Sequence, residues 1–217
     1  MGKNNLQERK ENTREVEYSL KPPFPKEILI DISSLCNHAC SFCSNTQMAD
    51  KQHASSDMVY RILKEAREEG SHAVGLYATG EPFLNKDLEK FIKYAKDIKY
   101  SYVFVTTNGA AATIKRVKTA IDNGLDSIKF SIHGGSRETY KKVHGKDDFE
   151  RVIENLIATD KYRKTNNKNV KIYVAMVETF VNMNETEKLK KIVEKHIDGW
   201  DQKKMFNSCG TMPENNE

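Results

Sequence analysis

Three cysteines stand close together in the chain, in a pattern suited to binding metal. Cys36, Cys40 and Cys43 lie within the segment SSLCNHACSFCSN, and the remaining cysteine, Cys209, is far away near the C-terminal end. The first residues lack the charged-then-apolar layout of a secretory signal, so we expect the chain in a reducing cytoplasm. Clustered cysteines in that compartment indicate metal or redox chemistry rather than disulfides.

Two kinds of metal centre suit three thiolates. A structural zinc site takes four ligands, and His38 or His53 could supply the fourth. An iron–sulfur cluster is normally held by four cysteines, so three would leave one iron open to bind another molecule. The strands and helices predicted around the cysteines help to decide between a zinc site and an iron–sulfur cluster.

Short apolar runs alternate with helical periodicity along the chain and predict the scaffold. The expected strands are Ile28–Ile32, Ala73–Tyr77, Tyr102–Thr106, Ser127–Ile132 and Ile172–Val177, with a weak sixth near Gln202–Phe206. Between the first two, Met58, Val59, Ile62, Leu63 and Ala66 recur at helical spacing, and similar patterns follow each later strand. This alternation predicts a parallel β/α architecture, and the pattern alone leaves a doubly wound sheet and a barrel both open.

Polar motifs follow four successive strands. The cysteines come after the first strand, ATGEP after the second, TTNG after the third and SIHGG after the fourth. In parallel β/α folds the functional residues gather at the carboxyl ends of the strands. These motifs are therefore expected to meet at one polar mouth, which indicates an enzyme. A closed zinc site would make poor use of that position, so the iron–sulfur interpretation is favoured.

The cysteine spacing is similar to that of a known family. Cys36-x3-Cys40-x2-Cys43, with Phe42 just before the third cysteine, resembles the radical S-adenosylmethionine (SAM) superfamily. The resemblance implies an α/β fold of the partial (β/α)6 TIM-like barrel type and a [4Fe–4S] cluster on these cysteines. It also implies that SAM chelates the open iron and is cleaved to a 5′-deoxyadenosyl radical, which takes hydrogen from a substrate.

The segment TGEP, residues 79–82, resembles the family's Gly-Gly-Glu-Pro turn, with Thr79 in place of the first glycine. The resemblance places Gly80 at the cofactor and makes Glu81 the acceptor for the ammonium group of SAM. A carboxylate at a glycine turn can form such a charge-assisted hydrogen bond. The alternative is that Glu81 caps the helix that follows.

The segment SIHGGSRETYKKVHG, residues 131–145, resembles the fourth-strand region of the subgroup that often carries a C-terminal SPASM or twitch cluster domain. The resemblance places Ser131 at the methionine carboxylate or the ribose of SAM. His144 stands where many relatives have an arginine that assists with the carboxylate. His144, Lys141 or Lys142 could substitute for that arginine.

Several residues near the expected mouth have two interpretations each. Asn108 lies near the cofactor or is a turn residue before a glycine. Phe42 leans on the adenine of SAM or packs in the core. His133 lines the mouth or merely completes a hydrogen bond. Tyr140 and Val143, at helical spacing, are expected to be packing residues.

The chain divides into a polar lead-in (1–26), a core domain (27–206) and a tail (207–217) that looks like a linker to an auxiliary-cluster domain. Cys209, in that tail, is expected to be a plain thiol. Near the end of the core, Asn184 is expected to be a helix N-cap, with Glu187 at the capping-box position. Two rival hypotheses are a non-catalytic zinc or iron–sulfur electron-transfer module and an incomplete chain that needs a partner domain.

Composition limits the partners. The chain has 217 residues, a net charge of +4 and 30% charged residues, with lysine and arginine interleaved with acidic residues. This pattern indicates solvated faces rather than a nucleic-acid surface, and no apolar run approaches membrane-spanning length. The expected partners are a peptide or small-molecule substrate and an electron donor such as flavodoxin or ferredoxin, with neither nucleic acid nor membrane.

Overall fold

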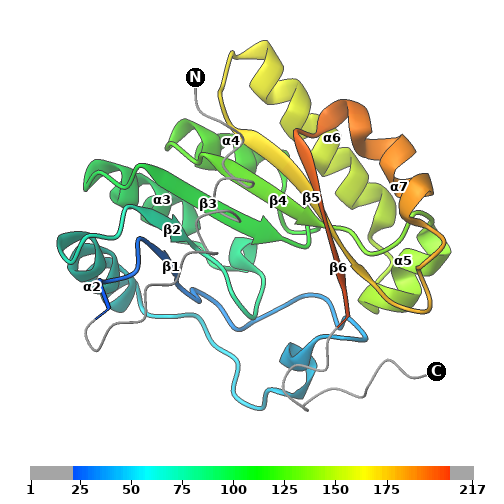
Figure 1. Ribbon diagram of the computed structural model, residues 1–217, viewed down its shortest axis with the longest axis horizontal. Coiled ribbons are helices and arrows are strands. Elements are labelled where there is room, and N and C mark those ends of the chain that lie inside the picture. Colours follow the sequence, from blue (N-terminus) through cyan, green and yellow to red (C-terminus); the bar gives the residue numbers. More distant parts are fainter. Residues whose placement is uncertain (1–21, 206–217) are drawn as a thin grey trace.

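The protein is described by a computed structural model that covers residues 22–205. Its strands are β1 (Glu27–Leu29), β2 (Ala73–Gly75), β3 (Tyr102–Thr107), β4 (Ser127–Ser131), β5 (Lys171–Glu178) and β6 (Gly199–Lys204). They form one sheet in the order β1-β2-β3-β4-β5-β6, and each neighbouring pair is parallel. A doubly wound sheet reverses its strand order in the middle, so this sequential order excludes it. The sheet curls into a half-barrel, as expected (Figure 1).

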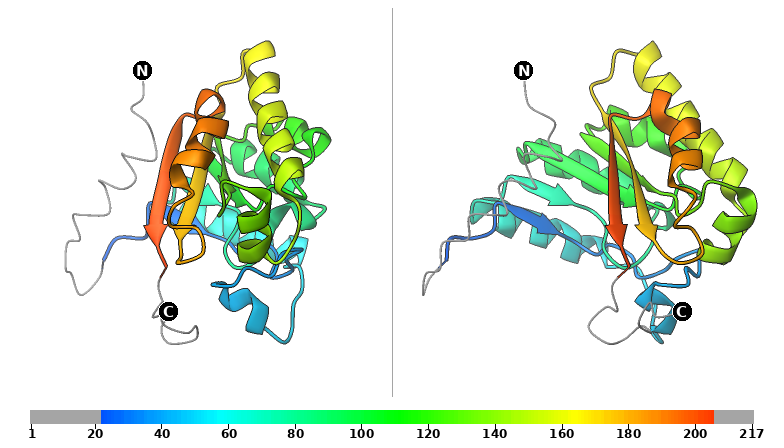
Figure 2. Two further views of the ribbon diagram at one scale, coloured as in Figure 1. Left: turned by 90° about the vertical axis from the view of Figure 1, so that its right-hand side faces the viewer. Right: turned by 45° about the vertical axis from the view of Figure 1, so that its right-hand side comes forward.

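The helices cover the outer face of the curved sheet. They are α2 (Ser56–Glu68), α3 (Leu88–Asp97), α4 (Ile114–Asp122), α5 (Arg137–His144), α6 (Phe149–Thr165) and α7 (Thr186–Val193). Short 3-10 turns lie at Ser44–Gln47 (η1), Pro82–Leu84 (η2) and Glu194–His196 (η3). Figure 2 shows the helices gathered on one side, while the concave side of the sheet carries no helix from residues 22–205.

Alternation along the strands separates the core from the concave face. Ile128 and Phe130 of β4 are fully buried in the main apolar cluster that the helices cover. Successive strand side chains point to opposite faces, so Lys129 between them faces the concave side. There its ammonium group lies 3.1 Å from the carboxylate of Asp201 on β6. The inner face is thus partly polar, whereas the outer face is the hydrophobic core.

Two details of the helices differ from the sequence-based expectation. The predicted N-cap at Asn184 is wrong, because α7 begins at Thr186 with Glu185 at its N-cap. The Glu185 carboxylate accepts instead from the Gly135 backbone N–H at 2.8 Å, at the start of α5. Helix α5 itself was not expected as a separate element. Its ends are set by Ser136, which accepts from the Thr139 backbone N–H, and by Gly145, whose φ of 66° stops the helix.

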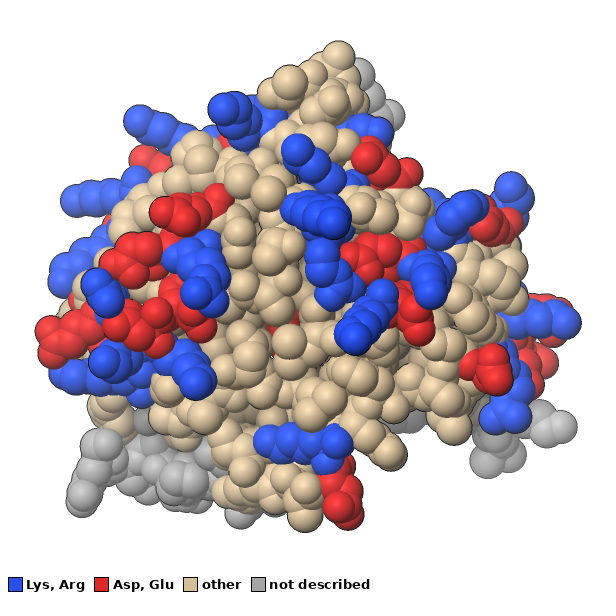
Figure 3. Space-filling view, turned by 180° about the vertical axis from the view of Figure 1, so that it is seen from behind, with Lys and Arg blue, Asp and Glu red and all other residues tan. Residues whose placement is uncertain are grey.

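The outer surface carries mixed charge. Figure 3 shows lysine and arginine side chains interspersed with acidic ones over the face seen from behind. Exposed pairs one helical turn apart account for part of this mixture, such as Lys93 with Asp97 at 2.8 Å and Lys142 with Glu138 at 2.8 Å. Among residues 22–205, no helix combines the length and the apolar character needed to cross a bilayer.

Candidate cluster and cofactor site

The three clustered cysteines lie on the loop that follows β1, at the carboxyl edge of the sheet. All three are free thiols. The loop is held against the end of α5, because the Ala39 backbone N–H donates to the His144 carbonyl at 3.0 Å and that of Ser41 donates to the Val143 carbonyl at 2.9 Å. The last carbonyls of a helix lack partners within it, and here the cysteine loop supplies them.

The thiols are close enough to influence one another electrostatically. Burial, followed by the charges of Cys43 and Cys36, raises the pKa of the Cys40 thiol. Burial is also the main cause that raises the pKa of Cys36. Both thiols therefore keep their protons at neutral pH in the metal-free chain. A metal centre that binds thiolates must displace those protons.

The TGEP turn packs directly on the cysteine loop. A Cβ atom at Gly80 would come within 2.1 Å of the Ser33 carbonyl oxygen and 2.6 Å of the Leu35 carbonyl oxygen, so only glycine fits. The next residue, Glu81, donates its backbone N–H to that same Leu35 carbonyl at 2.8 Å. Gly80 was expected at the cofactor, and the structure shows how it brings the second strand end against the loop that carries the cysteines.

Glu81 is a buried carboxylate with three neutral donors. It is 2% exposed and accepts from the backbone N–H groups of Phe83 at 2.9 Å and Asn108 at 2.7 Å, and from the Thr107 hydroxyl at 2.7 Å. The bond from Phe83 confirms the alternative that Glu81 caps the following turn. Burial raises its pKa to about 7, although these hydrogen bonds act in the opposite direction. Its contact with SAM stays a prediction.

Asn108 joins the third strand end to the first cysteine. Its side-chain amide N–H group donates to the side-chain oxygen Oδ1 of Asn37 at 2.9 Å and lies 3.7 Å from the Cys36 sulfur. Its own carbonyl oxygen accepts from the Ala110 backbone N–H at 3.0 Å. The turn interpretation of Asn108 is confirmed by the bond from Ala110, and the other end of the same amide lies at Cys36. Its contact with the cofactor stays a prediction.

The fourth strand end contributes Ser131 and His133. Ser131 is half-buried and shares the concave side with Lys129. His133 is 5% exposed, and its Nδ1 accepts from the Val177 backbone N–H at 3.0 Å. Phe42 meets the His133 ring edge to face, with ring centroids 4.9 Å apart. The partly buried Phe42 therefore packs on the strand end as well as standing next to Cys43.

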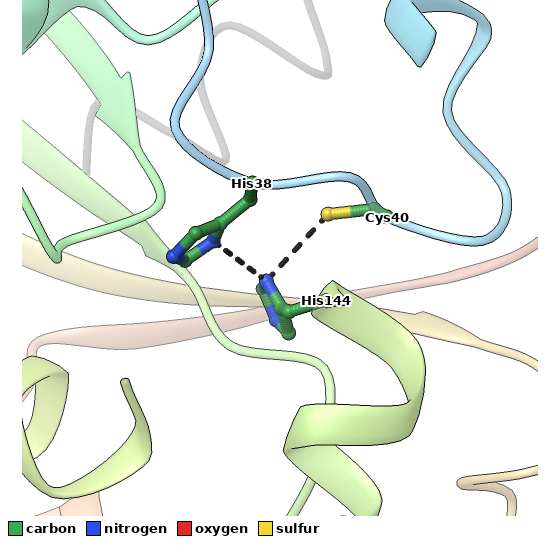
Figure 4. Close-up of side chains that lie close together, drawn as sticks. All are labelled: His38, Cys40 and His144. Carbon is green, nitrogen blue, oxygen red and sulfur yellow. Dashed lines mark hydrogen bonds between the residues drawn. The ribbon is translucent and has the colours of Figure 1, made fainter. Parts of the chain in front are cut away.

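His144 has a different setting from the one expected. It is the last residue of α5, is 0% exposed and stacks on Tyr140 with ring centroids 4.0 Å apart. Its Nε2 accepts from the His133 backbone N–H at 3.0 Å. Its Nδ1 lies 3.2 Å from His38 Nδ1 and 3.6 Å from the Cys40 sulfur, as Figure 4 shows. Both ring nitrogens have partners within the protein, so the geometry favours contact with a cysteine over contact with a cofactor carboxylate.

The zinc alternative can be examined at the same residues. Nitrogen and sulfur atoms of His38, Cys40 and His144 lie within 4.8 Å of one another, a spacing that a metal ion could span. A backbone N–H is always a donor, so the bond from His133 makes Nε2 of His144 the acceptor and leaves the ring proton on Nδ1. That nitrogen has no lone pair for a metal. The other expected zinc ligand, His53, is bound to the Ser33 hydroxyl at 3.0 Å.

Sequence reasoning missed one participant, Asp148. Its carboxylate lies 3.2 Å from Nε2 of His38, which is 7% exposed. Burial lowers the pKa of His38, and the hydrogen bond to Asp148 acts against it. The pair is 110 positions apart along the chain, so no local spacing could have indicated it.

Taken together, the geometry suits a metal cluster and a charged cofactor. Free thiols, two N–H donors near their sulfurs and a buried carboxylate that pairs with no cation among residues 22–205 meet at the carboxyl ends of β1 to β4. Residues 30–193 match the radical SAM superfamily, and the chain belongs to that superfamily. Its members use a [4Fe–4S] cluster and SAM.

Individual proteins are similar to this chain in sequence or in fold. The chain is 35% identical over 132 residues to a probable GTP 3′,8-cyclase of Saccharolobus islandicus, a match covering 60% of this chain and 42% of that protein. It superposes on Streptococcus suis SuiB bound to the precursor peptide SuiA with a TM-score of 0.75 at 19% identity, covering 88% of this chain and 42% of SuiB. For SuiB bound to S-adenosylmethionine the TM-score is 0.73 at 20% identity, covering 85% and 42%. The chain thus spans less than half the length of these relatives.

Proposed function

We propose that this chain cleaves SAM reductively at a [4Fe–4S] cluster held by Cys36, Cys40 and Cys43. A cluster held by these cysteines would supply the one electron that cleaves the C5′–S bond of the sulfonium to methionine and a 5′-deoxyadenosyl radical, which would take hydrogen from the substrate. The observation that carries this proposal is the meeting of three free thiols with Glu81 and Asn108 at one edge of a half-barrel. An electron-transfer module would have no use for the buried carboxylate of Glu81.

Protein residues have distinct tasks in this proposal. Glu81 accepts a hydrogen bond from the SAM ammonium, Ser131 binds the methionine carboxylate or the ribose, and Phe42 lies by the adenine. Asn108 holds the Cys36 region in place through its amide group. His144 lies behind Cys40 rather than beside the SAM carboxylate.

The substrate is proposed as a peptide or a small metabolite that enters from the concave face. The names of the relatives include one of each class, a nucleotide cyclase and a peptide-bound enzyme. A flavodoxin or ferredoxin is proposed as the electron donor, and a reducing cytoplasm as the location, since the site needs free thiols.

The test is an anaerobic assay for 5′-deoxyadenosine by mass spectrometry, with reconstituted protein, SAM and dithionite. We expect 5′-deoxyadenosine from the wild type and from Cys209→Ala, and none above background from Cys40→Ala. No 5′-deoxyadenosine from a fully reconstituted and reduced wild-type cluster would contradict the proposal. Stoichiometric zinc without iron after reconstitution would favour the structural zinc site.

A further inference from the structure

We propose that His144 is a positioning residue that donates a hydrogen bond from Nδ1 to the Cys40 sulfur and thereby makes the cluster easier to reduce. This inference rests on the proposed function, because it takes Cys40 as a cluster ligand. It concerns neither SAM contact nor metal ligation by the imidazole.

The direction of the hydrogen bond follows from the backbone. The His133 N–H lies 3.0 Å from Nε2 of His144 and can only donate, so Nε2 is the acceptor. The ring proton of neutral His144 therefore resides on Nδ1, which faces Cys40 at 3.6 Å. A flipped ring would place the carbon Cε1 against the His133 N–H, and the other tautomer would place a second N–H group there.

Two acceptors compete for this proton. His38 presents its own Nδ1 at 3.2 Å from Nδ1 of His144, while its Nε2 faces the Asp148 carboxylate at 3.2 Å. Since a carboxylate accepts, His38 carries its proton on Nε2 and offers a lone pair at Nδ1. The arrangement is a chain of donors and acceptors that runs from the His133 backbone N–H to His144 and from there to His38 or Cys40. Figure 4 shows the two contacts that His144 makes with His38 and Cys40.

A thiolate ligand changes the balance of this competition. Hydrogen bonds to a charged acceptor are stronger than those to a neutral one, so a cluster-bound Cys40 attracts the Nδ1 proton more than the thiol does. His144 is held for this task on three sides, by Tyr140 stacked on its ring, by the His133 N–H and by the bond from Ala39 to its carbonyl.

The expected consequence is electrochemical. Hydrogen bonds to the sulfurs help to set the reduction potential of an iron–sulfur cluster. Reduction adds negative charge to the cluster, so a donor at Cys40 stabilises the reduced form more than the oxidised form. Removing it should lower the equilibrium constant for reduction about tenfold, which is about 59 mV for a one-electron couple.

The test compares the cluster potential in three variants by redox titration followed by electron paramagnetic resonance. His144→Leu should shift the potential to more negative values. His38→Leu removes the competing acceptor, so its potential should stay unchanged or become more positive. His53→Leu is the matched control, because His53 bonds to the Ser33 hydroxyl in the same loop and contacts no sulfur among residues 22–205. Its potential should equal that of the wild type.

A second measurement needs no variant that could fail to fold. The iron–sulfur stretching bands of the wild-type cluster in resonance Raman spectra should shift between H2O and D2O, because the proton on His144 exchanges. Equal potentials in wild type and His144→Leu, or wild-type bands insensitive to D2O, would overturn this inference while leaving the proposed function standing. Protein that takes up no iron on anaerobic reconstitution would instead overturn the proposed function, and this inference with it.

Discussion

Two carboxylates are buried at opposite ends of the strands, and their partners differ in charge. Glu81 follows β2 at the carboxyl edge and accepts only from neutral donors, two backbone N–H groups and a hydroxyl. Asp160 lies on α6, which leads into the amino end of β5. It faces Arg163 at 2.9 Å, Lys164 at 2.7 Å and His196 at 2.8 Å. Each of the two is 2% exposed.

The difference appears in the protonation of the two groups. Burial is the largest single influence on both carboxylates, and taken alone it would raise the pKa of each. For Asp160 the hydrogen bonds from Lys164, His196 and Arg163 outweigh burial, so its pKa is lowered. For Glu81 the hydrogen bonds from neutral donors do not outweigh burial, so its pKa rises to about 7. Within residues 22–205 Glu81 has no ion-pair partner, and Arg116 acts on it only weakly.

This contrast separates a structural carboxylate from a functional candidate. Asp160 already has cationic partners, and its contacts join α6 to the segment that precedes β6. Glu81 lies by the cysteine loop and has no positive partner in the described part of the chain; the proposed function assigns that place to the ammonium group of SAM. A buried carboxylate without a cation is costly unless it is protonated or finds one.

The largest expected effect concerns stability. Asp160→Asn removes a counter-charge from Arg163, whose side chain is largely buried, so the free energy of unfolding should fall by about 3 kcal/mol. That value is at the low end for breaking a buried pair, because Arg163 also contacts Asp198. Urea denaturation would measure it. Glu138→Gln, in an exposed pair with Lys142, is the control and should leave the midpoint unchanged. Equal midpoints for the two variants would contradict the structural role of Asp160.

The second effect concerns cofactor affinity. Glu81→Gln should keep its iron but bind SAM more weakly by about 2 kcal/mol, or roughly 30-fold, because the ammonium loses a charged partner. Isothermal calorimetry under anaerobic conditions would measure this. Asp160→Asn, used below its unfolding midpoint, should bind SAM like the wild type. Unchanged affinity in Glu81→Gln would reduce Glu81 to the cap of η2.

The third effect is a pH dependence of opposite sign at the two sites. The folded-state pKa of Asp160 lies below its unfolded value, so its contribution to stability is present above the unfolded pKa and is lost as pH falls through the folded one. The folded pKa of Glu81 lies above its unfolded value, so its contribution is full below pH 4.5 and is lost as pH rises through about 7.

Unfolding free energies of metal-free protein across pH would show these slopes. The stability advantage of wild type over Glu81→Gln should shrink between pH 5 and 7, by at most about 1.4 kcal/mol per pH unit. The advantage over Asp160→Asn should shrink only in acid, below about pH 4. Parallel slopes for the two variants would mean that the two carboxylates do not differ as described.

Much of the fold could be predicted because apolar runs and helical spacing repeat. Expected strands lie within a few residues of β1 to β5, and the main error there is that β1 and β2 end early. The sequence did not predict α5 as a separate helix, because α5 is short and buries only two apolar residues, Tyr140 and Val143. The polar strand β6 was placed too late, since packing against β5 and not its own sequence sets where it begins.

The site was predictable where its residues follow strands, and unpredictable where they meet through folding. Cys36, Glu81 and Asn108 come together because parallel strands end at one edge. His38 and His144 are 106 positions apart, and only the packing of α5 on the cysteine loop joins them. The sequence drew attention to His144 because many relatives have an arginine there, but it did not indicate that His38 and Cys40 would be its partners.

The functional role of Glu81 in this contrast requires that the cysteine loop hold a cluster. Iron and sulfide should therefore be quantified in anaerobically reconstituted wild type, Cys40→Ala and Cys209→Ala. We predict about four irons and four sulfides per chain in the wild type and in Cys209→Ala, and a large loss in Cys40→Ala. Cys209 lies outside the described residues. Equal losses of iron in Cys209→Ala and Cys40→Ala would contradict the assignment of the cluster to Cys36, Cys40 and Cys43.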